Sequence, residues 1–96
     1  LENFIDSNYE NDFKNKTILI VEDDEGSYEY LKLVLEDYEV TVIWAKNGSE
    51  AIRLCEDNLQ IDLVLMDINM QVMNGYDATK EIRKFRKDIP IIWQTA

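Results

Sequence analysis

Two sets of acidic residues follow apolar runs and together could bind a metal ion. The mostly apolar run 17–21 is followed by Glu22 and Asp23, and the mostly apolar run 62–66 is followed by Asp67. If the two runs are neighbouring parallel strands, the three carboxylates meet at one edge of a sheet. Adjacent carboxylates repel one another unless a cation neutralises them, and oxygen ligands favour Mg²⁺ or Mn²⁺.

A carboxylate in such a site can also act as a nucleophile. Asp67 could attack a phosphorus centre, and the hydroxyl of Thr95, after the next predicted strand, could bond a phosphoryl oxygen. Each feature also has an ordinary structural interpretation. Residues 22–25 could be the acidic start of a helix, where negative charge complements the helix dipole. A threonine after a strand is by itself unremarkable.

Apolar runs and helical periodicity alternate from Lys16 onward. Short apolar runs rich in β-branched residues predict strands at 17–21, 40–44, 62–66 and 90–94. Apolar residues at helical spacing predict helices at 26–38, from about 49 to 58, and at 76–87, with Ile82 and Phe85 facing inward. Asn47 or Ser49 is available to cap the second helix. Short connections between alternating strands and helices predict a doubly wound parallel α/β sheet.

Length and composition exclude several classes of function. The chain has 96 residues, a formal charge of −10, one cysteine and no histidine. The negative charge argues against nucleic-acid binding, and the missing histidine removes imidazole catalysis and histidine-ligated zinc. No apolar run is long enough to cross a membrane. The polar, acidic residues 1–15 predict a linker or tail before the folded part at 16–96.

Four segments then resemble a known family. The segments KTILIVEDD (16–24), NGSEA (47–51), DLVLMDINM with VMNG (62–75) and IPIIWQTA (89–96) resemble, in order and spacing, the receiver (response-regulator) domain of two-component signalling. The resemblance implies a flavodoxin-like sheet with strand order 2-1-3-4-5. It also implies that a fifth strand, which bears a lysine, and the last two helices are missing from this chain.

The resemblance assigns a role to each candidate residue. Asp67 aligns with the phospho-acceptor, and Glu22 and Asp23 align with the acidic pair that holds Mg²⁺. Asn69 aligns with the position whose backbone carbonyl binds the metal, and Thr95 aligns with the switch hydroxyl. The expected function is phosphoryl transfer from a phosphohistidine to Asp67, catalysed by the receiver's own site, followed by a conformational switch.

The resemblance also implies partners and a location. The expected donor is a histidine kinase or a histidine phosphotransfer domain, and details of the sequence resemble receivers in hybrid sensor histidine kinases, whose kinase activity lies outside this chain. Tyr28 and Tyr30, beside the predicted cleft, could meet the donor helix. A cytoplasmic domain without membrane or nucleic-acid contact is expected. An apolar edge strand at 90–94 favours pairing into a homodimer or a strand-swapped assembly.

Other functions remain as alternatives. The main one is a receiver-like module that binds a partner without phosphorylation, which the missing lysine would favour. A flavin mononucleotide carrier would need a phosphate-binding loop where this chain has four acids, and an aspartate-dependent phosphatase would need a second acid at Asn69. The basic residues of the third helix and its end, Lys80, Arg83, Lys84, Arg86 and Lys87, are expected to form a solvated face.

Overall fold

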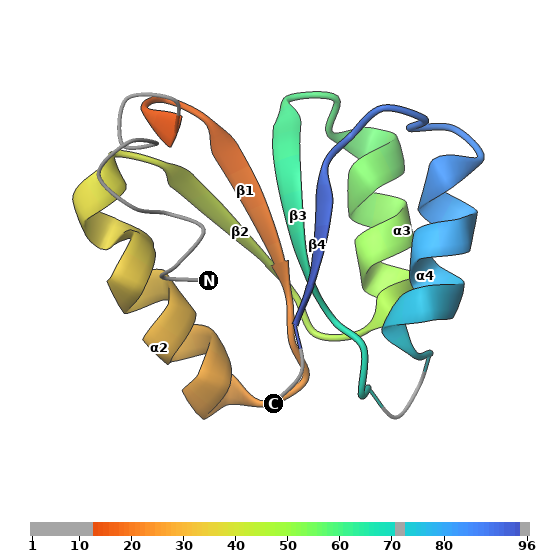
Figure 1. The fold of residues 1–96 in the computed structure, drawn as a ribbon, viewed down its shortest axis with the longest axis horizontal. Helices are drawn as coiled ribbons and strands as arrows, with labels where there is room; N and C mark the ends of the chain where they lie inside the picture. Colours follow the sequence, from red (N-terminus) through yellow and green to blue (C-terminus); the bar gives the residue numbers. More distant parts are fainter. Residues whose placement is uncertain (1–12, 71–72, 95–96) are drawn as a thin grey trace.

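The computed structural model describes residues 13–70 and 73–94, which form a parallel sheet between two layers of helices (Figure 1). The strands are β1 (Thr17–Val21), β2 (Thr41–Ala45), β3 (Ile61–Asp67) and β4 (Ile91–Gln94). The helices are α2 (Glu25–Leu35), α3 (Gly48–Asp57) and α4 (Gly75–Arg83), with a short 3₁₀ helix η1 (Glu36–Tyr38). The strand order is β2-β1-β3-β4 and every pairing is parallel, which confirms the predicted doubly wound fold.

Each face of the sheet is covered by its own helical layer. Helix α2 lies over one face, and α3 and α4 lie side by side over the other (Figure 1). Because side chains alternate along a strand, Ile18 and Ile20 of β1 pack toward α2, whereas Leu19 and Val21 pack toward α3 and α4. The central strands β1 and β3 are therefore buried on both sides, as their continuous apolar runs predict.

Side-chain caps fix where the helices begin. Asp24, Asn47 and Asn74 each accept a hydrogen bond from a backbone N–H three residues later, at 2.8 Å, 2.9 Å and 2.9 Å. Of the two caps predicted for α3, Asn47 is the one used. The three caps stand at the end of the sheet where the strands finish, so the helices start beside the predicted site.

The end of α4 differs from the prediction. The helix stops at Arg83 rather than at residue 87, and Phe85, expected to face inward, is 40% exposed. The reason is a set of hydrogen bonds from Arg86, whose guanidinium donates to the backbone carbonyls of Cys55, Asn58 and Ile61. These bonds hold the segment after α4 against the end of α3 and the start of β3.

The five basic residues of this region were expected to form a solvated face, but not all of them are solvated. Arg83 donates to the carbonyls of Lys87 and Ile89, and both Arg83 and Arg86 are half-buried. Lys80, Lys84 and Lys87 are exposed. The two arginines stabilise chain turns, and the solvated face is formed by the lysines alone.

Residues at the start of the described chain contribute to the core. Phe13, within the segment predicted to be a linker or tail, is 8% exposed and packs in the apolar cluster beneath α2. Residues 1–12 of that segment lie outside the described residues. Among the helices that the structure describes, none is long and apolar enough to cross a membrane.

Candidate functional site

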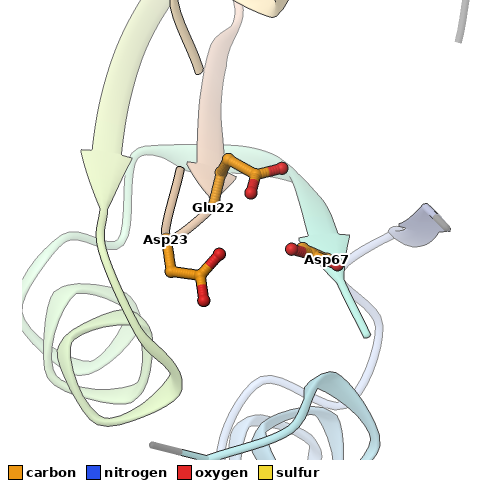
Figure 2. A group of neighbouring side chains, drawn as sticks. All are labelled: Glu22, Asp23 and Asp67. Carbon is orange, nitrogen blue, oxygen red and sulfur yellow. The ribbon is translucent and has the colours of Figure 1, made fainter. Parts of the chain in front are cut away.

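Three of the predicted site residues come together at the carboxyl ends of β1 and β3. Glu22 and Asp23 directly follow β1, and Asp67 is the last residue of β3. One carboxylate oxygen from each residue lies within 4.8 Å of the others, and the three side chains surround a common space (Figure 2). Asp67 is 8% exposed, Glu22 is half-buried and Asp23 is exposed. This oxygen-only set is the kind of site that suits a hard divalent cation.

The site is one wall of an open cavity of about 700 Å³. Helix α2 also lines the cavity, through Gly26, Ser27 and Tyr30. Asn69, which the resemblance assigned to the metal site, also lines the cavity, and its backbone N–H donates to Asp67 Oδ1 at 2.9 Å. The predicted switch residue Thr95 lies outside the described residues.

Crowding of the carboxylates changes the acidity of Glu22. Burial, together with the charges of Asp67 and Asp23 and a hydrogen bond with Asp67, raises the pKa of Glu22 to about 7, against an ordinary value of 4.5. A hydrogen bond from the backbone N–H of Asp24 opposes these effects. Glu22 therefore exchanges a proton near neutral pH when no cation is bound.

This acidity predicts a pH dependence of stability for the metal-free protein. Because the pKa of Glu22 is higher in the folded state than in the unfolded chain, proton uptake favours folding, and the free energy of unfolding falls as the pH rises from about 4.5 to 7. The pKa of Asp24 is lowered from 3.8 and that of Cys55 is raised from 9.0, so neither titrates in this window. Urea unfolding in EDTA at several pH values measures the slope, which Glu22→Gln should flatten. An equal slope in that variant would contradict the assignment.

Asp24 has a structural role beside the site. Its carboxylate accepts hydrogen bonds from the backbone N–H and the hydroxyl of Ser27, at 2.8 Å and 2.9 Å. These bonds lower the pKa of Asp24. The acidic run at 22–25 thus contains both candidate ligands and a helix cap, so the two interpretations of the run apply to different residues.

An aromatic pair supports the segment that carries Glu22. Tyr28 of α2 stacks on Trp44 of β2, with ring centroids 4.1 Å apart and ring planes 3° from parallel. The indole Nε1–H of Trp44 donates to the backbone carbonyl of Glu22 at 2.9 Å. The expectation that Tyr28 meets a partner is wrong, because its side chain is only 7% exposed and packs inside the domain. Tyr30, at 57% exposure, remains on the surface beside the cavity.

Gly75 holds the loop after Asp67 close to β3. A Cβ atom at this position would lie 2.6 Å from the backbone oxygen of Asp67 and 2.7 Å from Ile68 Cα. Both neighbours are backbone atoms, one in the last residue of β3 and one in the residue after it, so they cannot move aside easily. Only glycine permits this close approach.

Gly75→Ala is therefore expected to destabilise the protein by about 1–3 kcal/mol through overpacking. Gly26→Ala is the matched control, because it also lies in the first turn of a helix but its Cβ would meet nothing closer than 3.4 Å. There the higher helix propensity of alanine should leave stability unchanged or improve it by up to about 1 kcal/mol. Denaturant unfolding measures both variants, and equal effects would exclude the steric explanation.

Two residues that the sequence analysis did not single out also belong to the site. Trp44 donates its indole N–H to the backbone carbonyl of Glu22. Gln94, the last residue of β4, pairs in register with Asp67 and lines the same cavity. The position of Gln94 could have been predicted from the alternation of side chains along β4. Ile92, two residues earlier, packs toward α2, so Gln94 lies on the same face of the sheet. No sequence pattern indicated the hydrogen bond of Trp44.

Comparison with known proteins shows which ones this chain resembles. LuxN of Vibrio campbellii, an autoinducer 1 sensor kinase/phosphatase, is 35% identical over 79 residues, covering 82% of this chain and 9% of LuxN. The receiver domain of HemR from Leptospira biflexa is 44% identical with a TM-score of 0.77, covering 85% of this chain and 65% of that chain. The chain thus spans a small part of LuxN and about two thirds of the HemR structure.

A third relative has been solved in two complexes. The response regulator TrrA of Thermotoga maritima, in complex with Mg²⁺–BeF, is 38% identical with a TM-score of 0.80, covering 84% of this chain and 70% of that chain. A structure of the histidine kinase ThkA in complex with TrrA matches with a TM-score of 0.78. The model of the response regulator receiver domain family matches residues 18–96. The chain therefore belongs to the receiver domain family of two-component systems.

Proposed function

We propose that Asp67 accepts a phosphoryl group from a phosphohistidine donor. The observation that carries the proposal is the set of carboxylate oxygens of Glu22, Asp23 and Asp67 within 4.8 Å of one another, at the strand ends of a receiver fold. Asp67 is the most buried of the three, yet it lines an open cavity through which a donor can approach. Its position on a buried strand fixes the carboxylate as a nucleophile needs.

The proposed step is a transfer between two nucleophiles. An oxygen of Asp67 attacks phosphorus and forms an O–P bond, while the P–N bond to the donor imidazole breaks. The electron pair of that bond stays on the imidazole nitrogen, which takes a proton. The backbone N–H of Asn69, which donates to Asp67 Oδ1, holds the carboxylate in one orientation. Thr95 stays the predicted switch hydroxyl.

The residues present fit a divalent cation. Glu22, Asp23 and Asp67 would hold Mg²⁺, with the backbone carbonyl of Asn69 as the further ligand that the resemblance implies. When bound, the cation supplies positive charge that offsets the repulsion between carboxylates and phosphoryl oxygens. TrrA, which is similar to this chain, was solved with Mg²⁺–BeF, and this supports the assignment.

The proposed partner is a histidine kinase or a histidine phosphotransfer domain. The ThkA–TrrA complex supports a kinase partner for a receiver of this kind. Tyr30 offers an exposed aromatic ring at the rim of the cavity, where a donor helix would have to approach. The likeness to LuxN supports a place within a sensor kinase, and a cytoplasmic location is part of the same proposal.

Labelling with a small phosphoryl donor tests the proposal. The protein is incubated with radiolabelled acetyl phosphate or phosphoramidate, with Mg²⁺ or with EDTA, beside the variant Asp67→Asn. We expect Mg²⁺-dependent label on the unmodified protein and none on the variant. If the protein takes no label, or if the variant labels equally, the proposal fails; a complete absence of label would favour the phosphorylation-independent module.

A further inference from the structure

Gln94 belongs to a row of three side chains that crosses the sheet at the site. In the cluster beneath α2, Ile20 of β1, Leu65 of β3 and Ile92 of β4 form one row, because Ile20 pairs with Leu65 and Leu65 pairs with Ile92. Two residues further along, the same alternation gives the row Glu22, Asp67 and Gln94. Asp67 pairs with Gln94 in the register of β3 and β4. In the register of β1 and β3, Val21 pairs with Met66, so Glu22 and Asp67 are the next residues along these two strands. Asp67 therefore has an acid on one side and an amide on the other.

The side-chain amide of Gln94 is not fully hydrogen-bonded within the part of the chain that the structure describes. Its Nε2 atom is buried, and among the described residues it has no hydrogen-bond partner. A buried polar group without a partner is rare in native proteins, because it loses its bonds to water and gains none in exchange. An amide NH₂ can only donate, so the partner that is absent here must be an acceptor atom.

The surroundings of Gln94 indicate which acceptor is absent. The residue lines the same cavity as Glu22, Asp67 and Asn69. Asp67 Oδ1 already accepts the N–H of Asn69. A phosphoryl group on Asp67 would bring three further acceptor oxygens into the cavity, beside the residue that pairs with Asp67 across the sheet.

We propose that Gln94 donates its side-chain N–H to an oxygen of the phosphoryl group carried by Asp67. The inference rests on the proposed function and deepens it, since it names a residue of β4 that would bind the phosphoryl group. The amide of Gln94 can donate to a phosphoryl oxygen, and because it is uncharged it adds no negative charge that would attract Mg²⁺. The amide thus distinguishes the phosphorylated site from the site with metal alone.

The test uses beryllium fluoride, which binds carboxylates as a phosphoryl mimic, in the presence of Mg²⁺. The variant Gln94→Met keeps the length of the side chain and removes the donor. We expect it to bind Mg²⁺ within about twofold of the unmodified protein, and beryllium fluoride about tenfold or more weakly. Ile92→Met is the matched control, because it places the same side chain on the same face of β4, two residues before Gln94. It should bind both ligands as the unmodified protein does.

Calorimetry measures the affinity for Mg²⁺, and fluorine NMR measures the affinity for beryllium fluoride. The inference is overturned if Gln94→Met binds beryllium fluoride as tightly as the unmodified protein, or if Mg²⁺ and beryllium fluoride weaken equally. If the unmodified protein binds no beryllium fluoride in Mg²⁺, the proposed function fails, and the inference fails with it. Normal binding by the unmodified protein and by Gln94→Met would overturn the inference alone.

Discussion

Replacing Asp67 with asparagine is expected to stabilise the metal-free protein and to weaken Mg²⁺ binding about 100-fold. Asp67 is 8% exposed, and its carboxylate has an oxygen within 4.8 Å of oxygens of Glu22 and Asp23. Asparagine has nearly the same shape and keeps an oxygen that can accept the N–H of Asn69. The substitution therefore removes repulsion without leaving a cavity, and the gain in stability should be on the order of 1 kcal/mol at neutral pH.

Two measurements on the same samples check this result. Thermal unfolding in EDTA gives the stability of the metal-free protein, and calorimetric titration gives the Mg²⁺ affinity. Asp88→Asn is the matched control, because Asp88 is exposed and precedes β4, at the opposite end of that strand from Gln94. It should change neither quantity appreciably. A metal-free Asp67→Asn protein that is less stable, or that binds Mg²⁺ normally, would show that the carboxylates do not form one electrostatic site.

Trp44→Ala is expected to destabilise the protein by about 3 kcal/mol. The substitution removes the ring that stacks on Tyr28 at 4.1 Å and the donor that bonds the carbonyl of Glu22 at 2.9 Å. It also removes a cation–π contact, since the Lys46 ammonium lies 5.1 Å from the centre of the Trp44 ring. Because these contacts tie β2 to α2 and to the segment that carries Glu22, their loss affects the core and the site together.

Two further variants separate the contributions to this effect. Trp44→Phe keeps an aromatic ring for the stack and loses the indole donor, so it should cost about 1 kcal/mol. Trp93→Ala removes the other tryptophan, which is 50% exposed and makes an edge contact with Tyr76 at a centroid distance of 4.6 Å. Its cost, measured by urea unfolding, should stay near 1 kcal/mol, about the size of one aromatic pair. A larger cost for Trp93→Ala than for Trp44→Ala would contradict the account.

Much of the fold could be predicted because the sequence signals are local and strong. The strands at 17–21 and 62–66 are mostly apolar, and their residues 18–21 and 63–66 form the buried centre of the sheet. Their acidic ends had to meet once the strands were parallel neighbours, so the positions of Glu22, Asp23 and Asp67 followed from topology. The capping residue Asn47 was equally local, since its side chain bonds the backbone only three residues away.

The features that were missed depend on partners distant in the sequence. Arg86 bonds three carbonyls that lie between 25 and 31 residues away, so periodicity could not show that α4 stops early and leaves Phe85 exposed. Tyr28 was placed beside the cleft by its distance from the acidic run, but Trp44 on another strand determines which way its ring lies. Gln94 gains its significance only from the strand register that sets it beside Asp67.

Mapping the phosphorylated residue tests directly whether Asp67 is the phospho-acceptor. The protein is phosphorylated with acetyl phosphate in Mg²⁺, the acyl phosphate is reduced with borohydride, and the peptides are read by mass spectrometry. We expect a single modified residue, Asp67, which appears as homoserine. Modification at Asp23 or another acid with Asp67 unchanged, or no modification at all, would contradict it.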